Sequence, residues 1–324
     1  MKKVIFALAA VVALAACSKE QTVVSDRGDA IGFDSFIENS TRAIDPSYGT
    51  NNLVKEFYVW GTVKGNAMDN AMLLYNGARV YDNDPTYGVA YDCGQEEYWL
   101  PSATYNFVAL AGHDSVTPTT GMPTTISYTA DGETDLIYTK VGETVTTNPQ
   151  SVPEEGVNGN GCVAFTFNHL LSKVHFKFTN TSANSLCTYE ISDIKIAGAK
   201  KEGTYSITDS KWTSVSGTAA ALNFGTTGTT AIAQNGEATS DYARLLLPGE
   251  NQTLTVSFKQ KFYFNGQLMS ETPDDQPITK PLTATFAPNG AYVINVNLQA
   301  GSPITFTLNK LEGWGDADPI ITIK

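Results

Sequence analysis

The feature that most constrains this chain is a series of short apolar and aromatic runs separated by clusters of turn residues. The runs are rich in Val, Ile, Phe, Tyr and Thr, and the clusters in Gly, Ser, Asn and Thr. After the first 16 residues, no long stretch shows the 3.6-residue period of an amphipathic helix. This pattern predicts an all-β protein built from β-sandwiches. The clearest predicted strands cover residues 57–63, 105–110, 174–178, 191–196, 254–258 and 292–298.

A turn-rich segment at residues 144–161 marks the predicted boundary between two β-domains. It combines an Asn-Pro pair with a Pro-Glu-Glu-Gly run and an Asn-Gly-Asn-Gly run, and it offers little that a core could bury. A chain of 324 residues is long enough for two domains. We therefore expect an N-terminal β-sandwich over residues 43–155 and a C-terminal one over residues 156–324.

The first residues have the form of an export signal. Lys2 and Lys3 precede an apolar run at residues 4–16, and Cys17 follows directly. The run is shorter than the roughly 20 apolar residues that a spanning helix needs, which favours cleavage. Residues 14–17, Leu-Ala-Ala-Cys, look like a bacterial lipobox, so we expect residues 1–16 to be a lipoprotein signal peptide and Cys17 to be acylated, for example with palmitate. The alternative is an ordinary secretory peptide with an incidental cysteine.

Composition and cysteine number narrow the class of protein further. The formal net charge of −12 disfavours a nucleic acid partner, which would need a cationic surface. Charged residues are only 17% and aromatic residues 10% of the chain, so real cores are expected. Besides Cys17, three cysteines remain, Cys93, Cys162 and Cys187, and no Cys-x-x-Cys spacing is present. At most one disulfide can form, and free thiols are the default expectation.

A short strand is predicted just after the polar segment that follows Cys17. Within it Ile31, Phe33 and Ile37 share one face, because side chains alternate along a strand. A polar, turn-like segment with Arg42 and Ala43 comes next, and an exposed basic residue there suits a trypsin-like protease. Residues 17–42 are therefore expected to form a lipidated tether with a removable first strand.

Along nearly its whole length the sequence resembles the fimbrillin family, the subunits of protease-assembled pili in gut and oral anaerobes. The order and spacing of four segments carry this resemblance. They are residues 41–43 after a short strand, residues 98–110 with Trp, Pro and an aromatic strand, residues 135–138 followed by a Phe-x-His-x-x-Ser-Lys strand at 165–178, and Trp314 in Gly-Trp-Gly-Asp.

The resemblance implies a fold of two tandem transthyretin-like β-sandwiches and a specific assembly route. An arginine-specific protease would cut between Arg42 and Ala43, the first strand with Ile31, Phe33 and Ile37 would leave, and a strand of a neighbouring subunit would fill the groove. Only ten residues follow Trp314, so a long C-terminal donor segment is not expected. Candidate donor residues are Ile304, Phe306, Leu308, Ile321 and Ile323.

The partners implied are other pilus subunits, the arginine-specific protease, and the outer membrane through the lipid. A ligand on a host or bacterial surface is a further possible partner, which the sequence does not identify. The expected location is the outer membrane and cell surface, as part of a fimbria that supports cell adhesion. Residues 18–20, Ser-Lys-Glu, resemble the short signals that send some lipoproteins to that surface.

No pattern for catalysis or cofactor binding emerges. There is no Gly-x-Ser-x-Gly, His-Glu-x-x-His or Walker sequence, so neither enzyme activity nor a cofactor is expected. Of the three histidines, His169 and His175 flank one strand. Two interpretations remain for them, a metal site and a structural role as hydrogen-bonded histidines. The alternative function is that of a surface glycan-binding lipoprotein, in which an exposed tryptophan such as Trp212 would stack on sugar. Trp60 and Trp99 are expected in the core.

Overall fold

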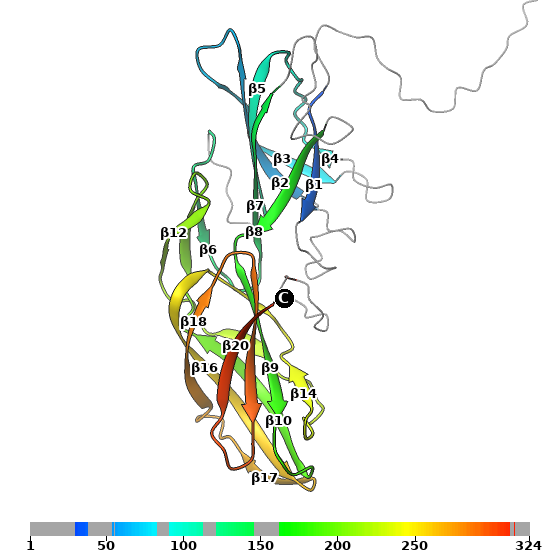
Figure 1. Cartoon of the computed structure of the whole chain (residues 1–324), viewed down its shortest axis with the longest axis vertical. Helices are drawn as coiled ribbons and strands as arrows, with labels where there is room; N and C mark the ends of the chain where they lie inside the picture. Colours follow the sequence, from blue (N-terminus) through cyan, green and yellow to red (C-terminus); the bar gives the residue numbers. More distant parts are fainter. Residues whose placement is uncertain are drawn as a thin grey trace, which may run out of the picture.

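The computed structural model describes residues 30–37, 54, 56–82, 91–112, 121–145, 162–311 and 314. These residues form twenty strands in four sheets and no helix, which confirms the all-β class. The molecule is elongated, with one group of strands above the other along its long axis (Figure 1). The described residues thus include no helix that could cross a bilayer.

The upper group is one seven-stranded sheet, here called the N-terminal roll. Its two end strands, β1 and β4, come close together, because the Ser35 hydroxyl of β1 bonds the Tyr91 hydroxyl of β4. Beside them, Ala30 bridges Tyr98 and the Ile31 N–H donates to the Glu97 carbonyl at 2.8 Å. The sheet therefore curls around its own core of aromatic and aliphatic side chains. In spatial order its strands are β1 (Gly32–Ile37), β8 (Cys162–His169), β7 (Leu136–Val145), β5 (Ala103–Gly112), β2 (Glu56–Gly65), β3 (Met72–Asp82) and β4 (Tyr91–Asp92).

The lower group is a two-sheet structure, here called the C-terminal sandwich, with a core dominated by Phe, Ile, Leu and Val. Asn265 and Gly266, both at positive φ, make the tight hairpin between β16 and β17. One sheet contains β13 (Leu222–Gly225), β10 (Cys187–Ala197), β16 (Gly249–Phe264), β17 (Gln267–Glu271) and β18 (Ile278–Phe286). The other contains β14 (Glu237–Thr239), β15 (Arg244–Leu246), β9 (Ser172–Asn180), β19 (Gly290–Leu298) and β20 (Thr305–Leu311).

A third sheet and a third core join the two groups. The sheet has the order β12 (Lys211–Ser216), β11 (Glu202–Ser206) and β6 (Thr125–Thr129), so a strand of the N-terminal half pairs with later strands. In the core beside it, the His169 ring bonds Asp135 and stacks on Trp314 with centroids 3.6 Å apart. The Lys173 ammonium donates to the Trp314 carbonyl at 2.9 Å. Through these contacts, Trp314 at the end of the described chain packs against the core that joins the two groups of strands.

The strands change from one group to the other at Leu170 and Leu171, between β8 and β9. β8 thus lies in the sheet of the N-terminal roll, although it follows the turn-rich segment at 144–161. The predicted division at residues 155 and 156 stays a prediction. All three described cysteines are free thiols: Cys187 is buried, while Cys93 and Cys162 are half-buried.

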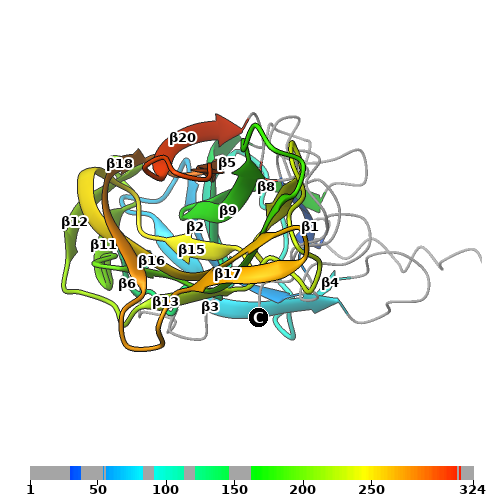
Figure 2. The same cartoon turned by 90° about the horizontal axis from the view of Figure 1, so that it is seen from below.

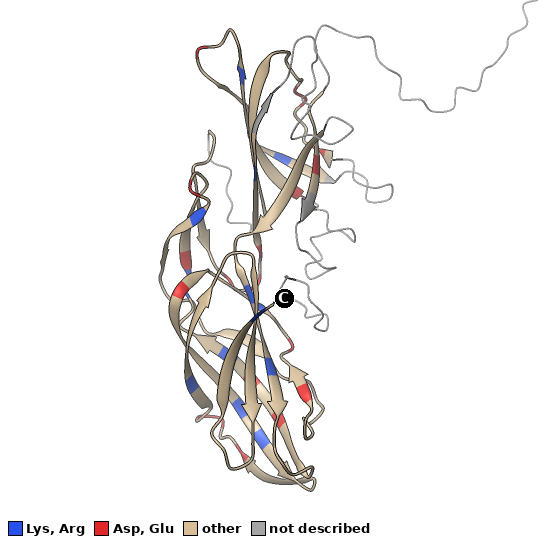
Figure 3. Cartoon of the chain, in the orientation of Figure 1, with Lys and Arg blue, Asp and Glu red and all other residues tan. Residues whose placement is uncertain are grey.

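Charges of both signs are interspersed along the described strands (Figure 3). On the C-terminal sandwich, the lysines of β16 pair with acids of neighbouring segments, for example Lys259 with Asp274 at 2.9 Å and Lys261 with Glu271 at 3.0 Å. Seen along the long axis, β12 and β18 lie on one side of the molecule and β1 and β4 on the other (Figure 2). The two sides therefore offer separate surfaces.

Candidate assembly edge

β1 is the edge strand that closes the N-terminal roll. It pairs in parallel with β8, from Gly32 opposite Cys162 to Ile37 opposite Phe167. β8 has β7 on its other side for only two residue pairs, so much of its backbone pairing comes from β1. The chain that leads into β1 is held by the bridge from Ala30 to Tyr98. Without β1, the β8 edge would be unpaired and the roll open.

Side chains alternate along β1, as a strand requires. Ile31, Phe33 and Ser35 point inward, with 6%, 7% and 2% of their surface exposed, while Gly32 and Asp34 are only half-buried. Ile31 and Phe33 are two of the residues that the sequence assigned to the removable strand. The side chain of the third, Ile37, lies outside the described residues.

Phe33 lies at the centre of an aromatic cluster. Its ring stacks on Phe165 of β8 at 5.8 Å and meets Tyr75 edge-on at 5.2 Å and Phe107 edge-on at 6.4 Å. Tyr75 is fully buried, and this burial raises the pKa of its phenol well above the ordinary value, so the ring stays neutral. Phe33 therefore packs among aromatic side chains from β3, β5 and β8.

Ser35 is a buried, hydrogen-bonded residue of this edge that the sequence did not predict. Its hydroxyl bonds the Tyr91 hydroxyl and accepts the Val54 N–H at 3.1 Å, and the Tyr91 hydroxyl donates to the Val54 carbonyl at 2.6 Å. A serine in an otherwise apolar alternation gives no signal by itself. Its role depends on two residues that only the fold brings near it, and together they tie β1 to the strand at the other end of the sheet.

Of the other residues predicted for assembly, three lie in or beside β20. Ile304, which precedes β20, and Phe306 and Leu308 within it, are half-buried against the core of the C-terminal sandwich. β20 is the edge strand of its sheet and pairs antiparallel with β19. The predicted lipidation residue Cys17, the cleavage residues Arg42 and Ala43, and the donor residues Ile321 and Ile323 lie outside the described residues.

The histidines and tryptophans of the described residues have mostly structural surroundings. No group of three or more His, Cys, Asp or Glu side chains in the described part could hold a metal ion. His169 is buried against Trp314 and Asp135, and His113 lies outside the described residues. Trp60, Trp99 and Trp314 are 1%, 0% and 4% exposed, whereas Trp212 is half-buried.

These features define the class: an elongated all-β protein whose described residues form edge strands and packed junctions. Comparison with protein families then assigns it, since the family model described as fimbrillin-like matches residues 41–314. The chain belongs to the fimbrillin-like family, which confirms the resemblance found in the sequence. The family consists of fimbrial structural proteins, which points away from enzyme activity.

Solved structures show the same fold. A protein from Bacteroides ovatus that has been proposed to act in cell adhesion is 17% identical, with a TM-score of 0.52 over 90% of this chain and 99% of that one. A fimbrial protein from Bacteroides vulgatus is 12% identical, with a TM-score of 0.52 over 87% of this chain and 99% of that one. No curated protein matches the sequence. Family and fold together support a pilus or cell-adhesion subunit at the cell surface.

Proposed function

We propose that this protein is a structural and adhesive pilus subunit that is exported as a lipoprotein and assembled by strand exchange. Its lipid on Cys17 would hold the precursor at the outer membrane until an arginine-specific protease cuts between Arg42 and Ala43. β1 then leaves, and a strand of another subunit takes its place beside β8. The observation that carries this proposal is that β1 is at once an edge strand and the closing strand of the N-terminal roll.

The vacated site has what a strand acceptor needs. The β8 edge over residues 162–167 would offer a row of unpaired N–H and C=O groups. Next to it, the pocket left by Phe33 would expose the rings of Tyr75, Phe107 and Phe165. Burying one large apolar side chain stabilises by about 1.5–3 kcal/mol, so an incoming strand with matching side chains has a strong driving force.

Candidate donors match the acceptor in spacing. Ile304, Phe306 and Leu308 present apolar side chains at every second position, as Ile31, just before β1, and Phe33 within it do. Ile321 and Ile323 repeat the spacing further along the chain. Either set could place an aromatic or aliphatic side chain in the pocket that Phe33 leaves.

Exposed apolar side chains at one end of the long axis support contacts between subunits. At the far end of the C-terminal sandwich, the β16–β17 hairpin carries three of them, and the Asn265 N–H bonds the carbonyl of a fourth, Leu186. Such a patch on a monomer commonly marks an interaction surface. The four are Leu186, Phe264, Leu268 and Met269, at 43%, 38%, 49% and 58% exposure. β17, which carries two of them, lies at the lower end of the molecule in Figure 1.

A disulfide that locks β1 to β8 tests the proposal. Gly32 lies directly opposite Cys162, and a Cβ on Gly32 would lie 2.6 Å from the Cys162 Sγ, so Gly32→Cys places two thiols within bonding reach. We expect the oxidised variant, once cleaved by an arginine-specific protease, to stay monomeric on denaturing gels and in size-exclusion chromatography. Reduction should release β1 and allow SDS-resistant oligomers to form.

The matched control is Asp34→Cys, on the same face of β1 but opposite Ala164, which has no thiol. This variant should assemble with or without reductant. Assembly by the locked Gly32→Cys protein would show that β1 need not leave. Failure of the unmodified protein to be cut at Arg42, or to oligomerise after the cut, would contradict the proposed maturation.

A further inference from the structure

A second surface, on the opposite side of the molecule from β1, has the features of a ligand site. A cavity of about 480 Å³ lies between β12, the start of β16 and the end of β18. Figure 2 shows β12 and β18 on the side away from β1 and β4. The volume is in the range of small-molecule sites, which is about 300–1,000 Å³. Nothing in the assembly route described above uses this cavity.

The cavity is lined by Trp212, whose ring is fixed from behind. The indole N–H donates to the Leu170 carbonyl at 2.8 Å, and the rings of Tyr205 and Tyr128 meet the indole edge-on at 5.5 and 6.3 Å. Gly203 makes room for it, because a Cβ there would lie 2.6 Å from the indole Cζ3. The half-buried indole therefore has its polar group satisfied inside the molecule and presents an immobilised aromatic surface to the cavity.

The rest of the lining divides into an apolar floor and a polar rim. Beside Trp212, the floor consists of half-buried Val215 with buried Pro248 and Phe286. The rim carries Lys211 and Glu250, which are exposed and form no ion pair with any described residue. Hydroxyl groups of Ser214 and Thr285 complete it. The rim thus offers donors and acceptors together with a balanced charge.

We infer that this cavity binds one pyranose unit of an uncharged glycan. A pyranose ring has an apolar C–H face that stacks on an aromatic ring and a rim of hydroxyl groups that both donate and accept hydrogen bonds. The Lys211 ammonium is a donor and the Glu250 carboxylate an acceptor, and their opposite charges favour a neutral ligand. The inference adds a glycan-binding site to the proposed pilus subunit, on the side away from β1.

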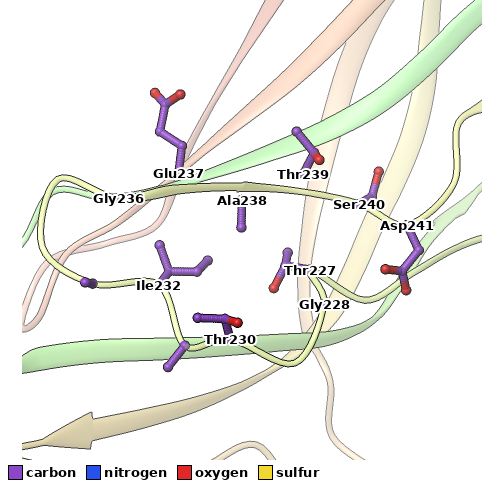
Figure 4. A pocket seen from close by; sticks show the side chains of 12 residues that line it. Thr227, Gly228, Thr230, Ile232, Gly236, Glu237, Ala238, Thr239, Ser240 and Asp241 are labelled. Carbon is purple, nitrogen blue, oxygen red and sulfur yellow. The ribbon is translucent and has the colours of Figure 1, made fainter. Parts of the chain in front are cut away.

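A larger cavity of about 610 Å³ beside β14 lacks these features (Figure 4). No aromatic ring lines it. Its Asp241 carboxylate already accepts from the N–H and the hydroxyl of Thr226 at 2.7 and 2.8 Å, and its Ser240 hydroxyl accepts the Phe176 N–H and donates to the Tyr242 carbonyl. The cavity beside β14 provides an internal control.

Trp212 gives the experiment its signal. Because the other three tryptophans are buried, iodide quenching of fluorescence in the purified full-length protein should report mainly on Trp212. The probes are the methyl glycosides of glucose, galactose, mannose and N-acetylglucosamine and short oligosaccharides of each. We expect at least one to protect Trp212 from iodide in a saturable manner, and calorimetry to give the same affinity.

Variants of the floor and the rim then locate the site. Trp212→Phe and Glu250→Gln should each weaken binding about tenfold or more, and Glu250→Gln leaves the packed core untouched. The control Glu237→Gln, on the lining of the cavity beside β14, should bind as the unmodified protein does. Absence of saturable binding by every probe overturns the inference. So does binding that Glu250→Gln and Trp212→Phe leave unchanged.

Discussion

β1 and β20 are both edge strands, yet they are held in the molecule in different ways. Their backbone pairing is similar, with six residue pairs between β1 and β8 and seven between β19 and β20. The side chains differ. Ile31, Phe33 and Ser35 are at most 7% exposed, whereas Phe306 and Leu308 are only half-buried. The two edge strands therefore differ in how deeply their side chains are buried, and not in the number of residue pairs that they form with the neighbouring strand.

This difference assigns the two edges to different roles in the proposed assembly. Emptying the β1 site would uncover a deep apolar pocket, which favours refilling it with another strand. Releasing β20 would uncover half-buried side chains on a sandwich whose remaining strands still pair with one another. In the proposed assembly, the β1 site would receive a strand and β20 would be given to another subunit. The predictions below can break or sharpen this contrast.

The largest difference is expected for truncation of the phenylalanine on each edge. Phe33→Ala removes the ring at the centre of the aromatic cluster and should lower the free energy of unfolding by about 3–5 kcal/mol. Phe306→Ala removes a half-buried ring at the rim of a core and should cost about half as much. Urea unfolding of the uncleaved protein, followed by tryptophan fluorescence, measures both.

Phe33→Leu is the matched control, since it keeps an apolar side chain in the pocket and should recover more than half of the loss. Equal destabilisation by Phe33→Ala and Phe306→Ala would remove the contrast between the edges. A larger loss for Phe306→Ala would reverse their roles.

The strand pattern could be predicted from sequence because it depends on local alternation. The runs predicted at residues 57–63, 105–110 and 292–298 fall inside β2, β5 and β19. Pairing could not be predicted, because it joins segments far apart in the chain. Thus β1 pairs with β8 across more than a hundred residues, and β8 joins the N-terminal roll although a turn-rich segment precedes it.

The candidate site shows the same limit at the level of single residues. The spacing of Ile31 and Phe33 was sufficient to expect a shared face, because apolar residues at every second position are a local signal. Ser35 carried no such signal, because its hydroxyl can be buried only where Tyr91 and Val54 form hydrogen bonds with it, and these residues are distant in sequence. Trp212 was an expected surface residue, but its cavity is built from three strands that sequence could not bring together.

A smaller difference is expected for hydroxyl groups on the two edges. Ser35→Ala removes the acceptor of the buried Val54 N–H and a partner of the Tyr91 hydroxyl, so we expect a loss of about 1–3 kcal/mol in the free energy of unfolding. Thr305→Ala on β20 removes an exposed hydroxyl and should change stability by less than about 0.5 kcal/mol. Thermal and urea unfolding of the two variants compare them directly. Equal effects would mean that the hydrogen bonds of Ser35 do not help to hold β1.

The smallest effect is expected at the surface of the N-terminal roll, where Glu56 of β2 pairs with Arg79 of β3. Two hydrogen bonds from the guanidinium, at 2.6 and 2.5 Å, hold the pKa of the Glu56 carboxyl below its ordinary value of 4.5. Because this pKa is lower in the folded state, the pair stabilises the fold above about pH 4.5 and loses that contribution as the pH falls further. The side chains are 41% and 57% exposed, so Glu56→Gln should cost under about 1 kcal/mol at pH 7 and less near pH 3. Urea midpoints of both proteins at the two pH values test this. A loss as large as that of Phe33→Ala would show that surface charge, rather than the side chains of β1, holds the roll closed.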